Sequence, residues 1–254
     1  QNIKYDLIVL RRHGFVLNGI RCDAMIASYV IDPSRRSHGL EDLSMNILGH
    51  RMVTYKDVVG TGKKALSFSQ VDVNTAMKYS CEDADLTLRL ARILLPRLEQ
   101  VGLQNLFYEI EMPLVEVLAD MEMMGVRVDK KRLQELSQEM DERMSSLEEC
   151  IYELAGEQFM INSHQQLGRI LFEKLKLPVG KKTKKKTGYS TDMEVLEQLA
   201  TQHPLPQAVL EYRSLAKLKS TYVDALLEMI NPETGRVHTS YNQTITATGR
   251  LSSS

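Results

Sequence analysis

The sequence predicts an α/β segment, then a mainly α-helical segment, and finally a strand at the C-terminal end. The apolar-rich run Lys4–Leu10 is typical of a sheet strand, and helical patterns follow it up to about residue 100. From about residue 101 onward only helical spacing recurs. Residues 244–248 alternate Thr with Ile or Ala, which is the period-two pattern of a strand, and Gly249 then ends that pattern.

The first segment contains three further helical patterns. Apolar residues recur at helical intervals in Gly19–Val30 and, over a shorter stretch, in Gly39–Leu48. A turn-rich stretch follows at Asp57–Gly62. Asn74–Glu99 then predicts a long amphipathic helix, because its leucines and isoleucines fall on one face.

The second segment predicts a series of helices with clear ends. An apolar stripe over Leu106–Met121 stops at Gly125, and Asp129 is placed to cap the long helix that follows it. Gly156 is a suitable stop for that helix. Pro204–Met229 predicts a last helical stretch before the final strand.

Two capping boxes are predicted between these long helices. Ser163 with Gln166 and Thr191 with Glu194 both have the required three-residue spacing before an apolar run.

Composition excludes several classes of protein. The chain has 254 residues, a formal net charge of −1 and three cysteines without a CxxC pair. That cysteine usage argues for a reducing compartment and against a disulfide framework or a structural zinc site. No apolar run approaches the roughly 18–20 residues of a membrane span. A net charge near zero means that any nucleic-acid surface must be local.

The C-terminal run carries the most specific signal. Arg236–Ser254 is dense in hydroxyl and amide side chains and contains Thr246-Ala-Thr-Gly-Arg-Leu-Ser-Ser253. This run resembles the beginning of the palm in family A DNA polymerases, where it lies beside the primer–template minor groove. Asn105–Val128 and Leu210–Tyr222 are similar to two further signatures of that family, so the resemblance covers essentially the whole chain.

The resemblance implies a fold and a function for each part. Residues 1–100 would be the C-terminal half of a 3′–5′ exonuclease domain with a ribonuclease H-like α/β fold, 101–235 the polymerase thumb, and 236–254 the start of the palm. The intact protein would extend a primer from dNTPs and proofread, with Mg²⁺ (or Mn²⁺) as cofactor. Primer–template DNA and dNTPs would be its partners, and it would be a cytoplasmic monomer with no membrane association.

The chain is expected to be an internal fragment, inactive by itself, because the palm carboxylates of the family do not occur in it. Two alternatives remain open. The first is a stand-alone DEDD-type 3′–5′ exonuclease, against which the thumb-like and palm-like segments argue. The second is a non-enzymatic helical DNA-binding module.

Asp6, Tyr79 and Asp83 are the candidate exonuclease residues. Tyr79 and Asp83 are four residues apart and share one face of a helix. On spacing alone, solvated surface carboxylates are the commoner interpretation. The resemblance implies instead that Asp6 and Asp83 hold a divalent metal ion and that Tyr79 orients the attacking water. Carboxylates are hard oxygen ligands that suit Mg²⁺ or Mn²⁺.

Three groups of residues are candidates for phosphate contacts in the helical segment. Lysine-rich loops are usually solvated charge runs, and polar residues at helix starts usually act as caps; a basic face on the helix near residue 215 is likewise usually only exposed. The resemblance favours DNA contact for all three groups. They are Lys181, Lys182, Lys184, Lys185 and Lys186; Asn162, Ser163, Ser190 and Thr191; and Arg213, Lys217 and Lys219.

Arg250 and Gln243 are the candidates for contact with the minor groove. Arginine suits that groove because its planar fork can donate to acceptors that every base pair presents. The alternatives are a surface salt bridge for Arg250 and a bond to buried backbone for Gln243.

Overall fold

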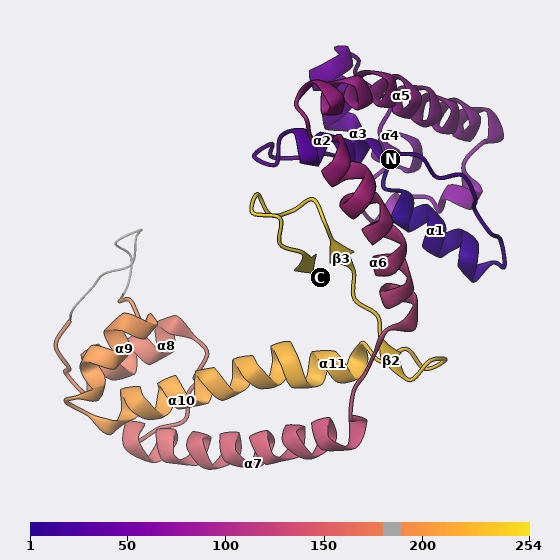
Figure 1. Cartoon of the computed structure of the whole chain (residues 1–254). Helices are drawn as coiled ribbons and strands as arrows, with labels where there is room; N and C mark the ends of the chain where they lie inside the picture. The colour runs from indigo at the N-terminus through magenta and orange to yellow at the C-terminus, as the bar shows by residue number, and fades with distance from the viewer. Residues whose placement is uncertain (180–188) are drawn as a thin grey trace. The chain divides into compact units, whose positions relative to one another are not determined.

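The structure, a computed structural model, describes residues 1–179 and 189–254, which form two compact units (Figure 1). Unit 1 contains residues 1–125 and 238–254, and unit 2 contains residues 126–237. No helix within the described ranges is both long and apolar enough to span a membrane.

Unit 1 is mainly helical. Its long helices are α1 (Ile3–Arg12), α2 (Ala24–Ile31), α5 (Val73–Gln100) and α6 (Met112–Met124). The short elements are α3 (Leu40–Leu43), α4 (Tyr55–Val59), the π-helical turns η1 (Ser44–Leu48) and η4 (Leu106–Glu111), and the 3₁₀ turns η2 (Gly62–Lys64) and η3 (Phe68–Gln70). The strands β3 (Tyr241–Asn242) and β4 (Ser252–Ser253) complete it.

The strand expected over Lys4–Leu10 is wrong, because these residues belong to α1. A short apolar run fits both a strand and a helix, and here packing decides between them. Leu7 is buried, whereas Tyr5 and Val9 are exposed, which is a helical arrangement of one inward side chain per turn. The described part of residues 1–100 contains no strand, so an α/β architecture is not seen there; the chain is mostly helical.

The core of unit 1 lies between α5 and the helices on either side of it in sequence. The predicted amphipathic helix is confirmed: α5 begins after Asp72, whose carboxylate accepts from the Thr75 amide, and it buries one apolar stripe. That stripe packs against α2, and its last three leucines share one core cluster with residues of η4 and α6. The buried side chains of the stripe are Leu86, Leu90, Leu94 and Leu98.

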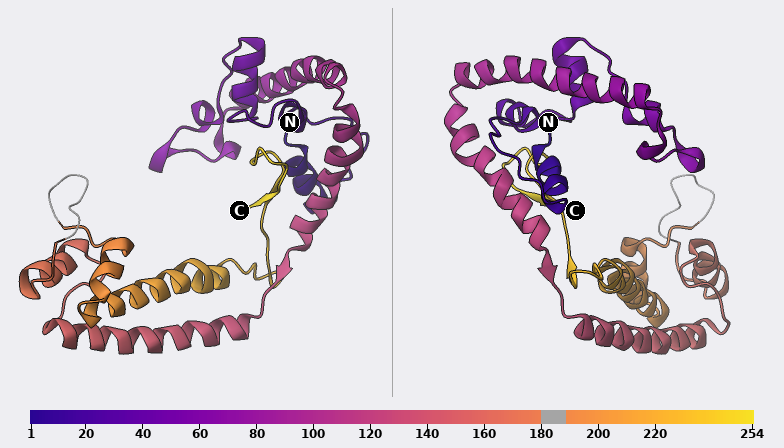
Figure 2. Two further views of the ribbon diagram at one scale, coloured as in Figure 1. Left: turned by 60° about the vertical axis from the view of Figure 1, so that its left-hand side comes forward. Right: turned by 90° about the vertical axis from the view of Figure 1, so that its right-hand side faces the viewer.

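Unit 2 is built on two long helices. They are α7 (Lys130–Ala155) and α10 (Pro204–Leu218), which lie side by side in Figures 1 and 2 and share the largest contact of the unit. The remaining elements are α8 (His164–Gly168), η5 (Arg169–Lys174), α9 (Met193–Ala200), η6 (Lys219–Asp224), α11 (Ala225–Glu228), β1 (Val126–Arg127) and β2 (Arg236–Val237). The two strands pair antiparallel, with Val126 opposite Val237.

The predicted ends of α7 are confirmed. The Asp129 carboxylate accepts from the Arg132 amide at the start, and Gly156 ends the helix with a φ of 67°. Ser163 caps α8 as expected, but the Gln166 side chain accepts from the Met160 amide and does not complete the first capping box. The second capping box is wrong. Asp192, one residue later than Thr191, accepts from the Val195 amide at the start of α9. A carboxylate is an excellent N-cap, and Asp192 takes this role in place of the neighbouring Thr191, whose hydroxyl is buried.

The strand expected over residues 244–248 is also wrong. The chain makes a hairpin instead, in which β3 pairs antiparallel with β4 and residues 243–251 form the loop. Gly249 has a φ of 77°, a conformation that glycine adopts without strain, and it helps to reverse the chain there. The Thr246 hydroxyl donates to the Arg250 carbonyl across the turn at 2.6 Å. Thr246 is therefore bonded within a turn and does not belong to a pleated strand.

One histidine is buried inside unit 1. His38 is 4% exposed, and its Nδ1 lies 2.9 Å from the Ser28 hydroxyl. Burial lowers the pKa of His38; Arg35 lowers it further, and Asp32 partly opposes both. His38 is therefore neutral in the folded chain at neutral pH.

We expect the free energy of unfolding to fall as the pH is lowered from about 7 to about 5. Below the ordinary histidine pKa of about 6.5, the unfolded chain binds a proton at His38 that the folded chain does not. His38→Gln should flatten the pH dependence of the melting temperature in this range. His13→Gln, which removes an exposed histidine of the same unit, is the control. An equal pH dependence in wild type and His38→Gln would contradict the assignment.

Candidate functional sites

Helix α5 brings Tyr79 and Asp83 together. The Tyr79 hydroxyl donates to the Asp83 carboxylate, and burial, followed by the charge of Asp83, raises the pKa of Tyr79 to about 12. Burial also raises the pKa of Asp83, against the bond from Tyr79. The Oδ1 atom of Asp83 is buried and has no hydrogen-bond partner in the described structure. A buried carboxylate oxygen without a donor is the kind of atom that a cation satisfies.

Three aromatic rings cluster around this site. The rings of Tyr55 and Phe68 are stacked with centroids 5.9 Å apart, and Tyr79 meets both edge-on at 6.3 and 6.0 Å. Exposed lysines occur in the same stretch of sequence as Tyr55 and Phe68, at positions 56, 63 and 64. Sequence reasoning missed Tyr55 and Phe68. The available signal was two aromatic residues in a turn-rich, lysine-containing stretch that offers them little core to fill.

Glu82 fastens the segment that carries Tyr55 to α5. One carboxylate oxygen lies 2.8 Å from His50 Nε2, and the other accepts from the Val53 amide at 2.8 Å. These bonds lower the pKa of Glu82, so it remains ionised. The loop before α4 is thereby held against the helix that carries Tyr79.

Asp6 and Asp83 have different charged neighbours. Its charged neighbours are the N-terminal amine and Asp23, whereas those of Asp83 are Glu82 and Glu41. Nowhere in residues 1–179 and 189–254 do three or more acidic, histidine or cysteine side chains gather as a metal site would require. The predicted ligand roles of Asp6 and Asp83 therefore stay predictions, and the orphaned oxygen of Asp83 is the feature that fits an ion.

The candidate residues at the starts of α8 and α9 differ in their availability. Asn162 is exposed, whereas the Ser163 hydroxyl accepts from the Gln166 amide, which is the capping alternative. The Ser190 hydroxyl donates to Asp192. Thr191 is 1% exposed and bonded to His164 Nδ1 at 2.7 Å. The Thr191 hydroxyl therefore already has a hydrogen-bond partner inside unit 2.

Arg213 is part of the same internal cluster. Its Nη1 donates to the Thr191 carbonyl at 2.7 Å, and its Nη2 is buried without a partner among the described residues. Burial lowers the pKa of Arg213. Lys181, Lys182, Lys184, Lys185 and Lys186 lie outside the described residues, so their predicted role stays a prediction.

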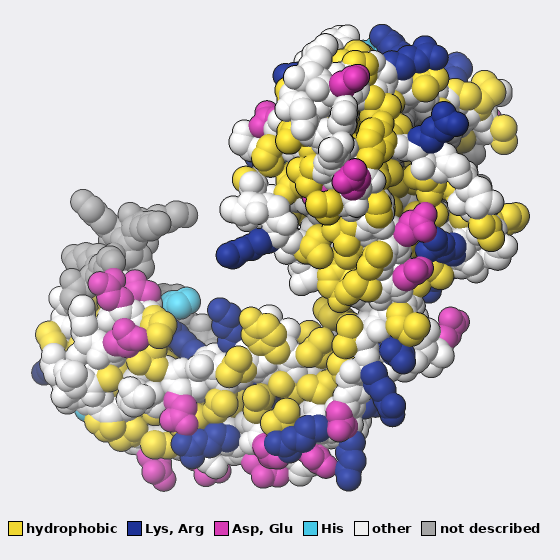
Figure 3. Space-filling model, viewed as in Figure 1, with side chains coloured by type: hydrophobic (Ala, Val, Ile, Leu, Met, Phe, Trp, Pro, Cys, Tyr) yellow, Lys and Arg dark blue, Asp and Glu magenta, His cyan; other side chains and the backbone are white. Residues whose placement is uncertain are grey.

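Lys217 and Lys219 have different surroundings although both follow Arg213 along the chain. Lys217 is exposed. The side chain of Lys219 is 16% exposed, and its Nζ lies 2.8 Å from Asp224 and 3.2 Å from Asp141, which ties η6 to α7. Lys219 therefore has a bracing role in unit 2 that Lys217 lacks. Figure 3 shows acidic and basic side chains interleaved along the α7 edge of this unit.

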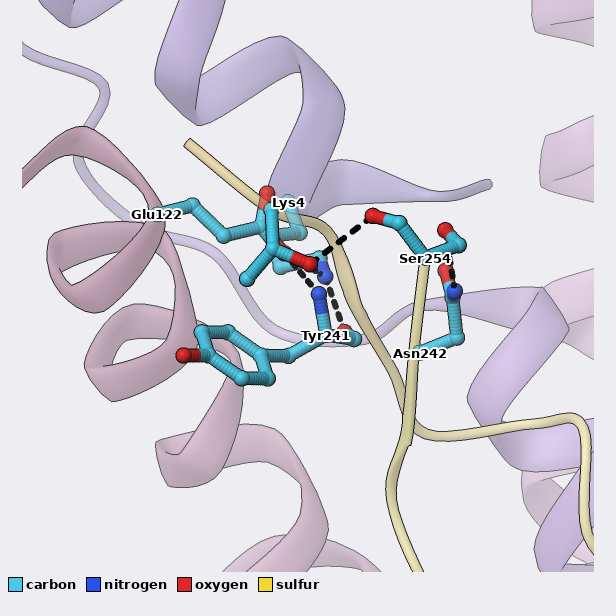
Figure 4. Close-up of polar contacts among 6 residues, drawn as sticks. Lys4, Glu122, Tyr241, Asn242 and Ser254 are labelled. Atoms are coloured by element: carbon cyan, nitrogen blue, oxygen red, sulfur yellow. Dashed lines mark hydrogen bonds and ion pairs between the residues drawn. The ribbon is translucent and has the colours of Figure 1, made fainter. Parts of the chain in front are cut away.

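The C-terminal hairpin is held by polar contacts to α1 and α6 (Figure 4). Lys4 pairs with Glu122 and also donates to the Tyr241 carbonyl. Glu122 accepts from the Tyr241 amide at 2.7 Å. At the end of the hairpin, Asn242 donates to the Ser254 hydroxyl. These contacts fix the hairpin on unit 1.

Gln243 and Arg250 stand at opposite extremes of exposure within this hairpin. Gln243 is 8% exposed and donates to both the carbonyl and the carboxylate of Glu111. This is the buried-backbone alternative for Gln243. Arg250 is exposed, and no acidic group of the described chain pairs with its side chain. The salt-bridge alternative for Arg250 is thus not seen.

Two family models match successive parts of the chain. A 3′–5′ exonuclease model matches residues 1–99, and a model for DNA polymerase family A matches residues 130–254. The first covers the Tyr79–Asp83 pair and the aromatic cluster; the second covers α7 to the hairpin. The chain therefore joins a region of the 3′–5′ exonuclease family to a region of the DNA polymerase family A type. The chain belongs to DNA polymerase family A.

Similar proteins agree with this assignment. DNA polymerase I of Rhizobium leguminosarum is 48% identical over the whole chain, and that of Pseudomonas aeruginosa is 46% identical. The chain spans only 25% and 28% of their respective lengths. A solved structure of the POL domain of Pol1 from M. smegmatis, in complex with DNA primer–template and dNTP, superposes with a TM-score of 0.78. It is 33% identical and covers 99% of this chain, which spans 40% of it.

Loss of the charge at Lys217 and at Lys219 should have different effects. Lys219→Met should lower the free energy of unfolding by on the order of 1 kcal/mol, because it removes two ion pairs from a largely enclosed ammonium. Lys217→Met should leave the melting temperature unchanged and should reduce the salt slope of DNA binding by about one. Thermal unfolding and a salt titration of duplex binding test both. The reverse pattern would show that Lys219, and not Lys217, is the phosphate contact.

Proposed function

We propose that this chain is part of a DNA-directed DNA polymerase I that extends a primer from dNTPs and removes mispaired ends by 3′–5′ exonuclease. The observation that carries the proposal is the order of the two family matches along one chain that is 46–48% identical, over its whole length, to two bacterial DNA polymerases I. Residues 1–100 are assigned to the exonuclease domain, 101–235 to the thumb and 236–254 to the start of the palm.

The family matches also weigh against the two alternatives. A stand-alone 3′–5′ exonuclease would not explain the polymerase match over residues 130–254. A non-enzymatic helical module would not explain the exonuclease match over residues 1–99. In the proposed protein, primer–template DNA and dNTPs are the partners, as they are in the M. smegmatis structure. A cytoplasmic monomer without membrane association fits this role.

The exonuclease site is proposed at Tyr79, Asp83 and Asp6. Asp83 and Asp6 would hold Mg²⁺ or Mn²⁺, and such an ion activates water and stabilises the leaving oxygen. The orphaned oxygen of Asp83 supports a ligand role. With a pKa of about 12, Tyr79 stays protonated at neutral pH, so it does not act as a general base. Its one proton goes to Asp83, and its hydroxyl oxygen remains to accept a hydrogen bond from the attacking water and so orient it.

The aromatic cluster is proposed to hold the end of a single strand beside that site. Exposed rings stack on bases of any sequence, and neighbouring lysines attract the phosphates. Tyr55 is half exposed at the start of α4 and stacks on Phe68, so one face of the pair remains for a base. Stacking without sequence preference is what removal of any mispaired nucleotide requires.

Duplex DNA is proposed to bind at exposed donors of the second family match. Asn162, Lys217 and Arg250 are exposed, and the lysine loop at 181–186 adds charge. Ser190 is bonded to Asp192 yet remains partly accessible. For Ser163, Thr191, Arg213, Lys219 and Gln243, whose polar groups have internal partners, contact with DNA would have to replace or supplement those bonds.

A chimera tests the whole proposal. This chain should replace the aligned segment of the Pseudomonas aeruginosa polymerase, and the chimera should extend a labelled primer and trim a mispaired end when Mg²⁺ is present. Asp83→Ala should abolish trimming and leave extension unchanged, because the carboxylate is an exonuclease ligand. Tyr79→Phe should slow trimming about tenfold, the effect of removing one hydrogen bond.

Asp85→Ala is the matched control for these variants. Asp85 lies on the same helix, is exposed and pairs only with Arg89 at 3.7 Å. Trimming at the wild-type rate by the Asp83→Ala chimera would refute the ligand role. Failure of the wild-type chimera to extend a primer would refute the polymerase assignment.

The isolated 254-residue chain should bind duplex DNA without sequence preference. Replacing Lys181, Lys182, Lys184, Lys185 and Lys186 with Ala should weaken that binding and reduce its salt slope by up to about five, one for each phosphate that the lysines no longer neutralise. Fluorescence anisotropy across a salt titration measures the slope. An unchanged slope would place the phosphate contacts elsewhere.

A further inference from the structure

The turn that carries Arg250 is held at its tip by a side chain from the opposite end of the sequence. The Tyr29 hydroxyl, from α2, donates to the Thr246 carbonyl at 2.7 Å. The Thr246 hydroxyl then donates to the Arg250 carbonyl at 2.6 Å. Two hydrogen bonds therefore connect Tyr29 to the backbone of Arg250, and all three residues belong to unit 1.

The donor end of this connection is rigid. Tyr29 is 4% exposed, and its ring lies in the core of unit 1. The His38 ring meets it edge-on, with centroids 5.6 Å apart and planes at 90°. His38 is itself fixed, because its Nδ1 bonds to Ser28 and its carbonyl accepts from the Gln1 amide side chain. The Tyr29 hydroxyl therefore has one position from which to hold the turn.

The acceptor end has little else to fix it. Ile245 and Leu251, the apolar residues on either side of the turn, are exposed, so packing does not hold it. The base of the hairpin is closed by the pairing of Asn242 with Ser252. Gln243 anchors the loop to Glu111 three residues before Thr246. Tyr29 supplies the bond closest to the tip.

The place from which the Arg250 side chain extends depends on this backbone. Arg250 is exposed and has no ion-pair partner in the part of the chain that the structure describes. No ion pair orients the guanidinium there, so the backbone of the turn fixes only the point from which the side chain extends toward DNA. A flexible turn would have to be ordered when DNA binds, which lowers affinity.

We infer that Tyr29 is a positioning residue for the Arg250 contact with DNA. This inference rests on the function proposed above for Arg250. Tyr29 lies within the region matched by the exonuclease model and Arg250 within the region matched by the polymerase model. The hydroxyl of one region thus pre-orders the DNA contact of the other.

A double-mutant cycle on the full chain tests the inference. The readout is the affinity for a fluorescently labelled primer–template duplex, with thermal unfolding measured beside it. Arg250→Gln should weaken binding about fivefold or more, as removal of a base contact does. Tyr29→Phe should weaken it about threefold to tenfold, the effect of one hydrogen bond. The double variant should bind no more weakly than Arg250→Gln alone.

Further variants separate positioning from a loss of structure. Thr246→Val removes the second bond and should weaken binding as Tyr29→Phe does, whereas Thr246→Ser keeps the hydroxyl and should restore it. Tyr5→Phe, which removes an exposed hydroxyl of α1, should change nothing. The melting temperatures of Thr246→Val and Thr246→Ser should match that of wild type, since residue 246 lies in an exposed loop.

The outcomes distinguish two kinds of failure. If Arg250→Gln binds like wild type, the proposed DNA contact of Arg250 is wrong, and its positioning by Tyr29 falls with it. If Arg250→Gln weakens binding but Tyr29→Phe does not, the contact stands and the positioning role is overturned. Equal weakening by Tyr29→Phe with and without Arg250 would also overturn the positioning role, because the effect would then be structural.

Discussion

The arrangement of unit 1 depends on one nearly buried carboxylate, that of Glu122. It pairs with Lys4 of α1 and accepts from the Tyr241 amide of the C-terminal hairpin, while the Glu122 carbonyl lies 2.8 Å from His238 Nδ1. A buried charge is tolerable only where it is both paired and hydrogen-bonded. Satisfying Glu122 therefore requires that three segments far apart in sequence, α1, α6 and the hairpin, come together at one point.

This constraint explains why a hairpin with exposed apolar residues stays in place. Its stability comes from polar bonds with defined geometry, which specify one arrangement more strictly than apolar contact does. Gln243 adds a second anchor on Glu111 and Tyr29 a third on Thr246. The exposed face around α6, where Figure 3 shows hydrophobic side chains gathered, contributes no such specificity. The position of Arg250 thus follows from the folding of the helices that precede it.

The sequence predicted the elements whose pattern repeats over many residues. It did not predict the local conformations that a single contact determines. Helices α5 and α7 were predictable because their apolar stripes extend over several turns and their caps are standard. The run Lys4–Leu10 is too short for its period to separate strand from helix. In the loop at 244–248, a bond from Tyr29, 217 residues away from Thr246, helps to set the conformation. No local pattern contains that information.

The candidate binding residues show the same limit. Residue type and spacing grouped Lys217 with Lys219, and Ser163 with Asn162, yet one member of each pair has an internal partner. A polar group that is already bonded must replace that bond or use a remaining donor to contact a phosphate, so its internal bond limits how it can bind. Only the fold shows which donors remain available, whereas the family resemblance shows only where donors should be sought.

The Asp83 carboxylate is the opposite case, a group that the fold leaves unsatisfied. Asp85, two residues further along α5, is exposed and pairs with Arg89, as surface carboxylates usually do. Asp83 is turned inward, its pKa is raised by burial, and Tyr79 provides a donor while Oδ1 has none. Burial of an unpaired carboxylate oxygen lowers stability, and groups whose pKa is shifted by burial are common at functional sites. The cost becomes intelligible if a cation completes the site, because the same burial that raises the pKa of Asp83 would then strengthen its attraction to that cation.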